Sequence, residues 1–132
     1  MTRTRRFKND RHSVTAARHF ATAVLARQPE EIVNAVELLV SELASNCVRH
    51  TDSDFEVAIT ATRTEISVAA TDWGAGQPIM RSPAPTDLSG RGLVIIDALS
   101  AEWGVTHRGG ERPAKTVWFS LTVQAVEEPV CS

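Results

Sequence analysis

The sequence predicts an α+β fold, a two-layer α/β sandwich with helices on one face of a mixed, mostly antiparallel sheet. Two observations predict it. Apolar residues recur at helical spacing through residues 1–50, and later segments alternate apolar and polar residues as half-buried strands do. One further helical segment falls between strand segments. At 132 residues the chain is long enough for one such domain and too short for two.

Three elements are expected in the first part of the chain. A short edge strand is predicted over residues 4–8, followed by a helix that Ser13 caps and that ends near Arg27. A second helix begins at Pro29, carries acidic residues in its first turn, and runs to about His50. Each helix has one apolar face: Val14, Ala17, Ala21, Val24 and Leu25 in the first, and Ile32, Val36, Leu39, Leu43 and Cys47 in the second.

Strands and a long loop make up the remainder. Residues 55–61 and 66–70 alternate as two strands of a hairpin that turns at Arg63-Thr64 and runs directly into Asp72. Residues 72–92 hold four of the seven glycines and three of the six prolines, so this segment is expected to be mostly loop. The last predicted elements are a helix over 92–101 and two strands, over 103–107 and 116–123.

Composition and charge exclude several functions. With 42% hydrophobic and 23% charged residues, the chain belongs among ordinary globular proteins. The net charge of −2 gives no general attraction to nucleic acid or to an anionic membrane, and the basic residues between Arg3 and Arg11 are interpreted as a solvated edge rather than a binding arm. Cys47 and Cys131 suggest neither a disulfide framework nor a metal cluster. No segment resembles a signal peptide or a membrane span, so we expect a cytoplasmic protein.

Polar residues at the edge of an apolar helix face mark a candidate site. Glu42, Asn46 and His50 lie four apart along the second helix, where a packed helix normally carries small or apolar side chains. Taken alone, Glu42 and Asn46 would suit a solvated helix face, and His50 would suit a helix C-terminus. Asp72 continues the alternation of its strand, so its carboxylate is expected to point inward and to need a partner or a ligand.

Two glycine-containing segments follow Asp72. Gly74 and Gly76 let a ligand come close to the main chain. Residues 89–92 (SGRG) open the late helix, whose free amides favour an anion such as phosphate. Each feature alone is weak, since a GxG sequence is most often only a turn.

Four motifs follow one another along the chain: Glu42-x-x-x-Asn46, Asp72-x-Gly74-x-Gly76, Gly90-x-Gly92-Leu93 and Lys115-Thr116. Their order and spacing resemble the GHKL ATP-binding superfamily, which includes sensor histidine kinases, heat-shock chaperones and gyrase, and which has the Bergerat-type fold. The phrases VSELASNCVRH, GRGL and KTVWF are similar to those of single-domain anti-sigma-factor serine/threonine kinases of actinobacteria. The resemblance covers about residues 5–123 of a single domain spanning 1–132, with 124–132 as a tail. The phosphate-loop signature GxxxxGK[ST] is absent.

The resemblance implies a site for ATP and Mg²⁺. Asn46 would offer the metal a neutral side-chain oxygen, and Glu42 would accept a proton from an attacking hydroxyl or position a water. Asp72 would accept a hydrogen bond from the amino group of adenine, with the hydroxyl of Thr116 helping to hold the base. The other nucleotide contacts that it implies are Gly74, Gly76, Gly90, Arg91, Gly92 and Leu93.

The resemblance further implies a protein serine/threonine kinase that phosphorylates a small anti-sigma-factor antagonist. A sigma factor and a second copy of the chain are further expected partners, whereas nucleic acid and membranes are not. Leu88 departs from the best-known kinases of this group, which carry there an arginine that reaches the terminal phosphates; Arg91 or Arg81 would have to replace it. The alternative function is a non-catalytic switch whose affinity for a protein partner depends on ATP versus ADP. A detached catalytic domain of a histidine kinase is a more distant alternative.

Overall fold

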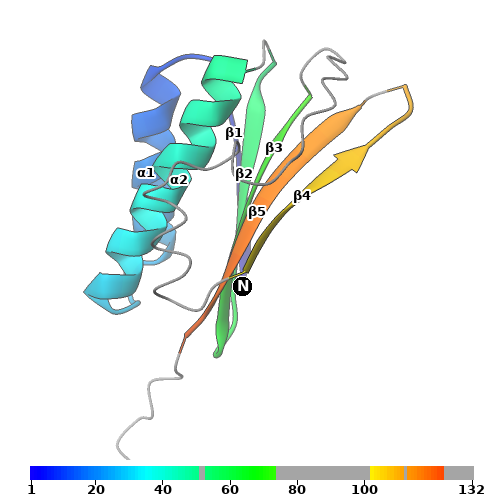
Figure 1. The fold of residues 1–132 in the computed structure, drawn as a ribbon. Helices are drawn as coiled ribbons and strands as arrows, with labels where there is room; N and C mark the ends of the chain where they lie inside the picture. Colours follow the sequence, from blue (N-terminus) through cyan, green and yellow to red (C-terminus); the bar gives the residue numbers. More distant parts are fainter. Residues whose placement is uncertain (51–52, 74–101, 112, 124–132) are drawn as a thin grey trace, which may run out of the picture.

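The computed structural model describes residues 1–50, 53–73, 102–111 and 113–123. Two helices and five strands form within these residues (Figure 1). The predicted helix over 92–101, most of the predicted loop over 72–92 and the predicted tail lie outside them. In chain order the elements are β1 (Thr2–Phe7), α1 (His12–Val24), α2 (Glu30–His50), β2 (Phe55–Ala61), β3 (Glu65–Asp72), β4 (Glu102–Arg108) and β5 (Ala114–Thr122).

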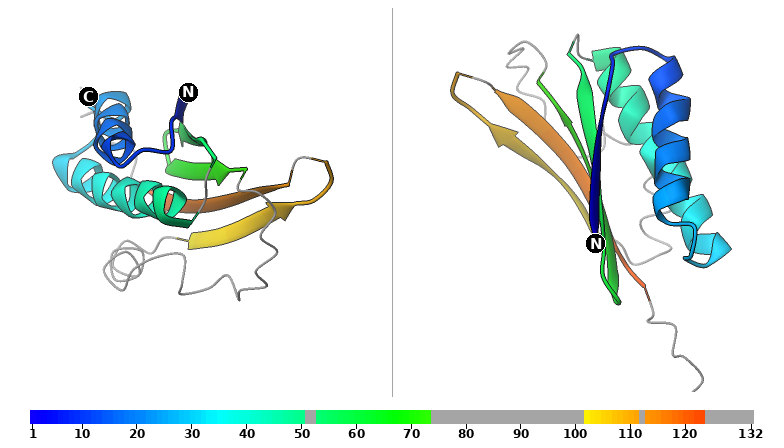
Figure 2. Two further views of the ribbon diagram at one scale, coloured as in Figure 1. Left: turned by 90° about the horizontal axis from the view of Figure 1, so that it is seen from above. Right: turned by 180° about the vertical axis from the view of Figure 1, so that it is seen from behind.

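The strands form one sheet in the order β1-β2-β3-β5-β4. Every neighbouring pair of described strands is antiparallel. Both described helices lie on the same face of this sheet, with α1 packed beside α2 (Figures 1 and 2). The predicted α+β sandwich is confirmed, and its described strands are antiparallel throughout rather than mixed.

The start of α1 differs from the prediction. The helix begins at His12, so Ser13 lies inside its first turn instead of capping it. The N-cap residue is Arg11, which makes no side-chain cap hydrogen bond, and Oδ1 of Asp10 just before it accepts a hydrogen bond of 2.8 Å from the backbone N–H of His12. An aspartate oxygen suits this position because the first N–H groups of a helix have no partner within it. The helix ends at Val24, three residues before the predicted end at Arg27.

The long helix α2 forms as its sequence predicts. The carbonyl of Pro29 accepts hydrogen bonds from the N–H groups of Ile32 and Val33, which fixes the first turn. Glu30 and Glu31 lie in that turn, where the helix dipole favours negative charge. The inner face of α2 is fully buried from its middle to its end: Val36, Leu39, Val40, Leu43, Ala44 and Cys47.

The core fills the space between the helices and the sheet. Alternate residues of β2, β3 and β5 point toward the helices, and each of these side chains is almost fully buried, including Phe55, Ile66 and Phe119. Phe7 closes the β1 edge of this core by stacking on Phe55, with ring centroids 5.4 Å apart. Such alternation between a buried and a partly exposed face is typical of an antiparallel sheet covered on one side.

The opposite face of the sheet carries mainly small and hydroxyl side chains. Residues such as Ala58, Ala69 and Thr116 are half-buried there. The indole ring of Trp118 lies across Gly104 of the neighbouring strand, so close that a Cβ atom built on Gly104 would come within 2.7 Å of Cζ2 of the ring. Gly104 therefore makes room for the tryptophan. Within the described residues, neither helix combines the length and the apolar character needed to cross a membrane.

Candidate functional site

Two polar residues occupy successive turns of α2, beside its buried inner face. Glu42 is half-buried, and Asn46, one turn later, is only 8% exposed. Their neighbours Leu43 and Cys47 belong to the core. Residues four apart share one side of a helix, so the two polar side chains form one edge of the helix layer, as the sequence predicted. The side chain of His50 lies outside the described part of the structure.

Asp72 ends β3 with its carboxylate directed toward the helices. It follows Val68 and Ala70 in the alternation of the strand and is 4% exposed. The inward orientation predicted from the sequence is therefore confirmed. Asn46 and Asp72 are the buried polar side chains of the described residues. A buried carboxylate is costly unless polar groups surround it, so this position serves something other than packing.

Cys47 connects α2 to this carboxylate. Its Sγ lies 3.9 Å from Oδ2 of Asp72, within the distance at which a thiol donates a weak hydrogen bond. Burial raises the pKa of the Cys47 thiol from 9.0 to about 12, and the negative charge of Asp72 adds to this effect. The thiol therefore stays protonated at neutral pH and serves as a donor, not as a nucleophile.

Lys115 is the residue that the sequence analysis did not assign to this site. It lies directly opposite Asp72 in the β3–β5 pairing. Directly opposite residues of an antiparallel pair project from the same face of the sheet, so Lys115 also faces the helix side. Its positive charge lowers the pKa of Cys47, against the larger effects of burial and of Asp72. A cation, a carboxylate and a thiol thus meet at one end of the β3–β5 pair.

Thr116, which the resemblance implies as a contact of the base, follows Lys115 in β5. It pairs with Thr71, and the two hydroxyl oxygens are 2.7 Å apart. Thr71 precedes Asp72 in the strand, so both threonines project from the other face of the sheet. The role of the Thr116 hydroxyl in holding the base stays a prediction. The alternation of Val117, Phe119 and Leu121 in the core is the signal that identifies Lys115, one residue earlier, as the residue on the Asp72 side.

The amide oxygen of Asn46 accepts a hydrogen bond from Arg49. The distance from Nη2 of Arg49 to Oδ1 of Asn46 is 3.0 Å. Arg49 is exposed, whereas Asn46 is buried. The edge of α2 that carries the candidate metal ligand therefore also carries a positive charge at the surface.

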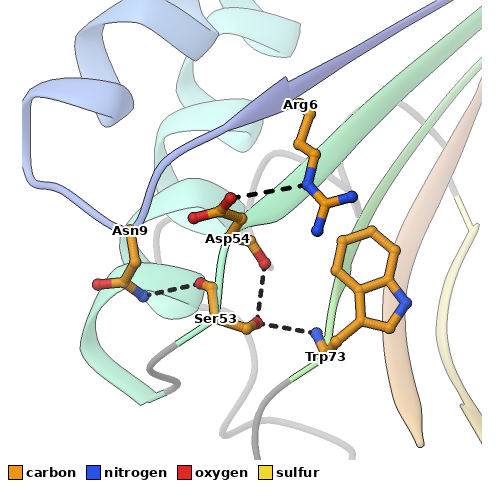
Figure 3. Close-up of polar contacts among 5 residues, drawn as sticks. All are labelled: Arg6, Asn9, Ser53, Asp54 and Trp73. Carbon is orange, nitrogen blue, oxygen red and sulfur yellow. Dashed lines mark hydrogen bonds and ion pairs between the residues drawn. The ribbon is translucent and has the colours of Figure 1, made fainter. Parts of the chain in front are cut away.

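A polar network around Ser53 holds the end of β3 against the end of α2 (Figure 3). Oγ of Ser53 accepts a hydrogen bond of 2.9 Å from the backbone N–H of Trp73, the residue after Asp72. Nδ2 of Asn9 donates to the backbone oxygen of Ser53 at 3.1 Å and to that of Cys47 at 3.4 Å. The network ties together the two segments that carry Asp72 and Cys47.

Arg6 of β1 closes the outer side of this network (Figure 3). Its guanidinium lies 4.7 Å from the centroid of the Trp73 ring, and its Nε lies 3.7 Å from Oδ2 of Asp54. The contact between a guanidinium and an indole face is attractive, whereas the exposed ion pair contributes little. Trp73 is thus a packing residue on the face of the sheet away from Asp72.

The remaining predicted site residues lie outside the described part of the chain: Gly74, Gly76, Gly90, Arg91, Gly92 and Leu93. Among the described residues no three His, Cys, Asp or Glu side chains gather as a metal cluster. A magnesium ion bound with a nucleotide does not need one, because it takes most of its oxygen ligands from water and phosphates. The amide oxygen of Asn46 is a ligand of the kind that such an ion uses.

Comparison with known proteins identifies the family of this fold and site. A family model described as the histidine kinase-like ATPase domain matches residues 7–121. The match includes α1 and α2, β2 to β4 and nearly all of β5, together with Glu42, Asn46, Asp72 and Lys115. A search of curated proteins found no match.

Proposed function

We propose that this chain, which belongs to the histidine kinase-like ATPase domain family, is a protein serine/threonine kinase of the anti-sigma-factor type. Its substrates would be ATP and a serine or threonine of a small anti-sigma-factor antagonist, and a sigma factor would be a second partner. The observation that carries the proposal is the buried carboxylate of Asp72 against Cys47 of α2, the helix that also carries Glu42 and Asn46.

Asp72 is suited to recognising the adenine base of ATP. A carboxylate accepts hydrogen bonds, and the exocyclic amino group of adenine donates them. Guanine has a carbonyl oxygen at the same place, and two facing acceptors repel each other. Cys47 supports this role because its thiol donates a weak hydrogen bond to Oδ2 of Asp72 and joins the carboxylate to α2. The site would therefore select ATP over GTP.

Asn46 is suited to holding Mg²⁺ beside the phosphates. Its amide oxygen is a hard, neutral ligand that adds no negative charge next to a triphosphate. When bound, the ion neutralises part of the phosphate charge. The main-chain amides of Gly90 and Gly92, with Arg91 beside them, are the proposed phosphate contacts, at the start of the helix that the sequence predicts over 92–101.

Glu42 is suited to receive the proton in the transfer step. The hydroxyl oxygen of the partner's serine bonds to the terminal phosphorus as the bond between that phosphorus and ADP breaks, and the hydroxyl proton passes to Glu42. Glu42 is half-buried and lies one turn before Asn46 on the same side of α2, which supports a position near the proposed phosphates. ADP and a phosphoserine or phosphothreonine are the products.

The experiment that tests this function isolates the partner first. The tagged protein is used to recover partners from its native cell, and the recovered material is incubated with ATP labelled in its terminal phosphate. We expect labelled partner with the wild-type protein and at least about 10²-fold slower labelling with Glu42→Ala, the usual range for loss of a general base. Glu37→Ala is the matched control, because Glu37 lies on the same helix but pairs with Arg18 outside the site.

The second candidate function is an ATP- or ADP-gated binding switch without phosphoryl transfer. Leu88 favours this switch. The best-known kinases have an arginine at that position, and its charge stabilises the transferred phosphoryl group. Leu88→Arg separates the two functions. A faster transfer in this variant supports the kinase, whereas no transfer in either protein, with partner affinity that still differs between ATP and ADP, supports the switch.

A further inference from the structure

Lys115 lies beside the carboxylate that is proposed to bind adenine. It is directly opposite Asp72 in the antiparallel β3–β5 pair, and the Cβ atoms of such residues are about 4.5–5.5 Å apart. Its side chain is half-buried. Burial and the charge of Asp72 raise the pKa of the Cys47 thiol and the charge of Lys115 lowers it, so this charge acts across to α2. The ammonium group therefore lies on the same side and at the same end of the sheet as the Asp72 carboxylate.

A carboxylate and an ammonium group side by side offer a ligand one acceptor and one donor. The carboxylate only accepts hydrogen bonds, whereas the ammonium group has three N–H donors and no acceptor. Lys115 can therefore donate to Asp72 and still have a donor for a ligand. The other cross-strand neighbour of Asp72 is Phe55 of β2, which is apolar. The donor beside the carboxylate thus lies on the β5 side.

The Watson–Crick edge of adenine matches this pair of groups. Its amino group donates, and the ring nitrogen N1 next to it accepts. Protein sites that take up a single base commonly form hydrogen bonds to this edge. In guanine the two positions are reversed, because a carbonyl oxygen replaces the amino group and N1 carries a hydrogen.

We infer that Lys115 is a second specificity-determining residue of the base site, which donates a hydrogen bond to N1 of adenine while Asp72 accepts one from the amino group. This inference rests on the proposed binding of ATP at Asp72. It adds a contact that rejects guanine, because the ammonium group and the N1–H group of guanine are both donors. The base is then recognised by neighbouring residues of two paired strands, β3 and β5.

A simpler role for Lys115 predicts a different result. A positive charge beside a buried carboxylate stabilises its charged form without touching a ligand. In that role, replacement of Lys115 would destabilise the fold or weaken every adenine ligand by the same factor. A contact with N1 predicts instead a loss that depends on whether the ligand has a nitrogen at that position.

The test compares ATP with 1-deaza-ATP, in which a C–H group replaces N1, by calorimetric titration in the presence of Mg²⁺. We expect the wild-type protein to bind 1-deaza-ATP about tenfold or more weakly than ATP, the usual size for a charge-assisted hydrogen bond. Lys115→Met should lose a similar factor for ATP and should bind the two nucleotides within about twofold of each other. Lys115→Arg keeps the charge and the donors, so it should restore part of the difference.

The matched control is Lys8→Met. Lys8 is the other lysine of the chain, and it is exposed just after β1, an edge strand that β2 separates from β3. This variant should keep the wild-type ratio of the affinities for ATP and 1-deaza-ATP. The wild-type comparison itself does not depend on the folding of any variant.

The outcomes separate this inference from the function on which it rests. Equal wild-type affinities for ATP and 1-deaza-ATP would overturn the contact with N1 while ATP binding stands. A Lys115→Met protein that keeps the wild-type ratio of the two affinities would overturn the contact as well. A wild-type protein that binds neither nucleotide would overturn both the inference and the proposed function. A ratio that is lost in Lys115→Met and kept in Lys8→Met supports the contact.

Discussion

Asp72 on β3 and Lys115 on β5 are directly opposite residues that face the helix layer together. The pair places a cation across the strands from a carboxylate that is 4% exposed. Cys47 lies against the same carboxylate, and its pKa reflects both charges. The carboxylate therefore contacts a thiol from α2 and lies across the strands from a lysine of β5.

The first prediction concerns Asp72. Asp72→Asn should weaken ATP binding by roughly 1–3 kcal/mol, because one buried polar group is then mispaired with the base. The same substitution should also reduce the preference for ATP over GTP. Calorimetric titration with both nucleotides measures the two effects. Glu65→Gln is the control, since Glu65 is an exposed carboxylate at the other end of the same strand. Equal affinities of the wild-type protein for ATP and GTP would rule out this reading of Asp72.

The second prediction concerns Asn46. Asn46→Ala should remove the dependence of ATP affinity on magnesium while the far-ultraviolet circular dichroism spectrum stays that of a folded protein. The physical reason is that the amide oxygen contributes to the metal and the side chain lies at the edge of the core. Asn34→Ala provides the control, because Asn34 is exposed on the same helix. An unfolded Asn46→Ala protein would instead assign Asn46 a structural role.

The third prediction concerns pH and Cys47. The folded pKa of about 12 lies above the ordinary value of 9.0, so above pH 9 the unfolded chain releases a proton that the folded chain retains. The free energy of unfolding should therefore fall as pH rises from about 9 toward 12, by at most about 1.4 kcal/mol per pH unit from this group. Below pH 9 this group should cause no change.

Urea denaturation at pH 8 and pH 10.5 measures the effect of Cys47. The change in the free energy of unfolding between the two pH values is compared in the parent and in Cys47→Ala. The difference between these changes is the effect of Cys47, because the other titrating groups are common to both proteins. Cys131→Ser in both backgrounds removes the second thiol of the chain. Identical pH slopes in the parent and in Cys47→Ala would show that the thiol is not buried against Asp72.

The fourth prediction concerns the contact between Gly104 and Trp118. A Cβ at position 104 would lie 2.7 Å from Cζ2 of the indole, so Gly104→Ala forces the ring or the edge strand to move. We expect a loss of about 1 kcal/mol or more in stability, as for other overpacked positions. Gly109→Ala is the control, since a Cβ there meets nothing within 4 Å. Thermal unfolding compares the two variants, and equal melting temperatures would contradict the contact.

The sequence predicted the architecture because each layer has its own periodicity. The stripe of α2 and the alternation of β2 and β3 specify which residues turn inward, and the same alternation predicted the burial of Asp72. The sequence predicted Ser13 as the cap of α1, whereas the side-chain oxygen that accepts from the first turn belongs to Asp10. Both are good caps, and the choice depends on where the chain turns after β1.

Lys115 was not assigned to the site for a geometric reason. Motif resemblance identified Lys115-Thr116 but not which of the two faces the helices, and a shift of one residue along a strand moves a side chain to the other face. The contact between Arg49 and Asn46 follows from the spacing of a helix and was available from the sequence. The network around Ser53 could not be predicted from the sequence, because it joins residues from four separate parts of the chain.

The position of Trp73 gives the protein a built-in optical probe. Its backbone follows Asp72 directly and is fastened to Ser53, while its indole lies under the guanidinium of Arg6. Indole emission responds to nearby charge, so any shift of the β3 end relative to β1 changes the light that this residue emits. Replacing Trp103 and Trp118 by phenylalanine leaves Trp73 as the single tryptophan of the chain, which has three in all. Stopped-flow fluorescence of that protein would then time ligand arrival at the neighbouring carboxylate without an added dye.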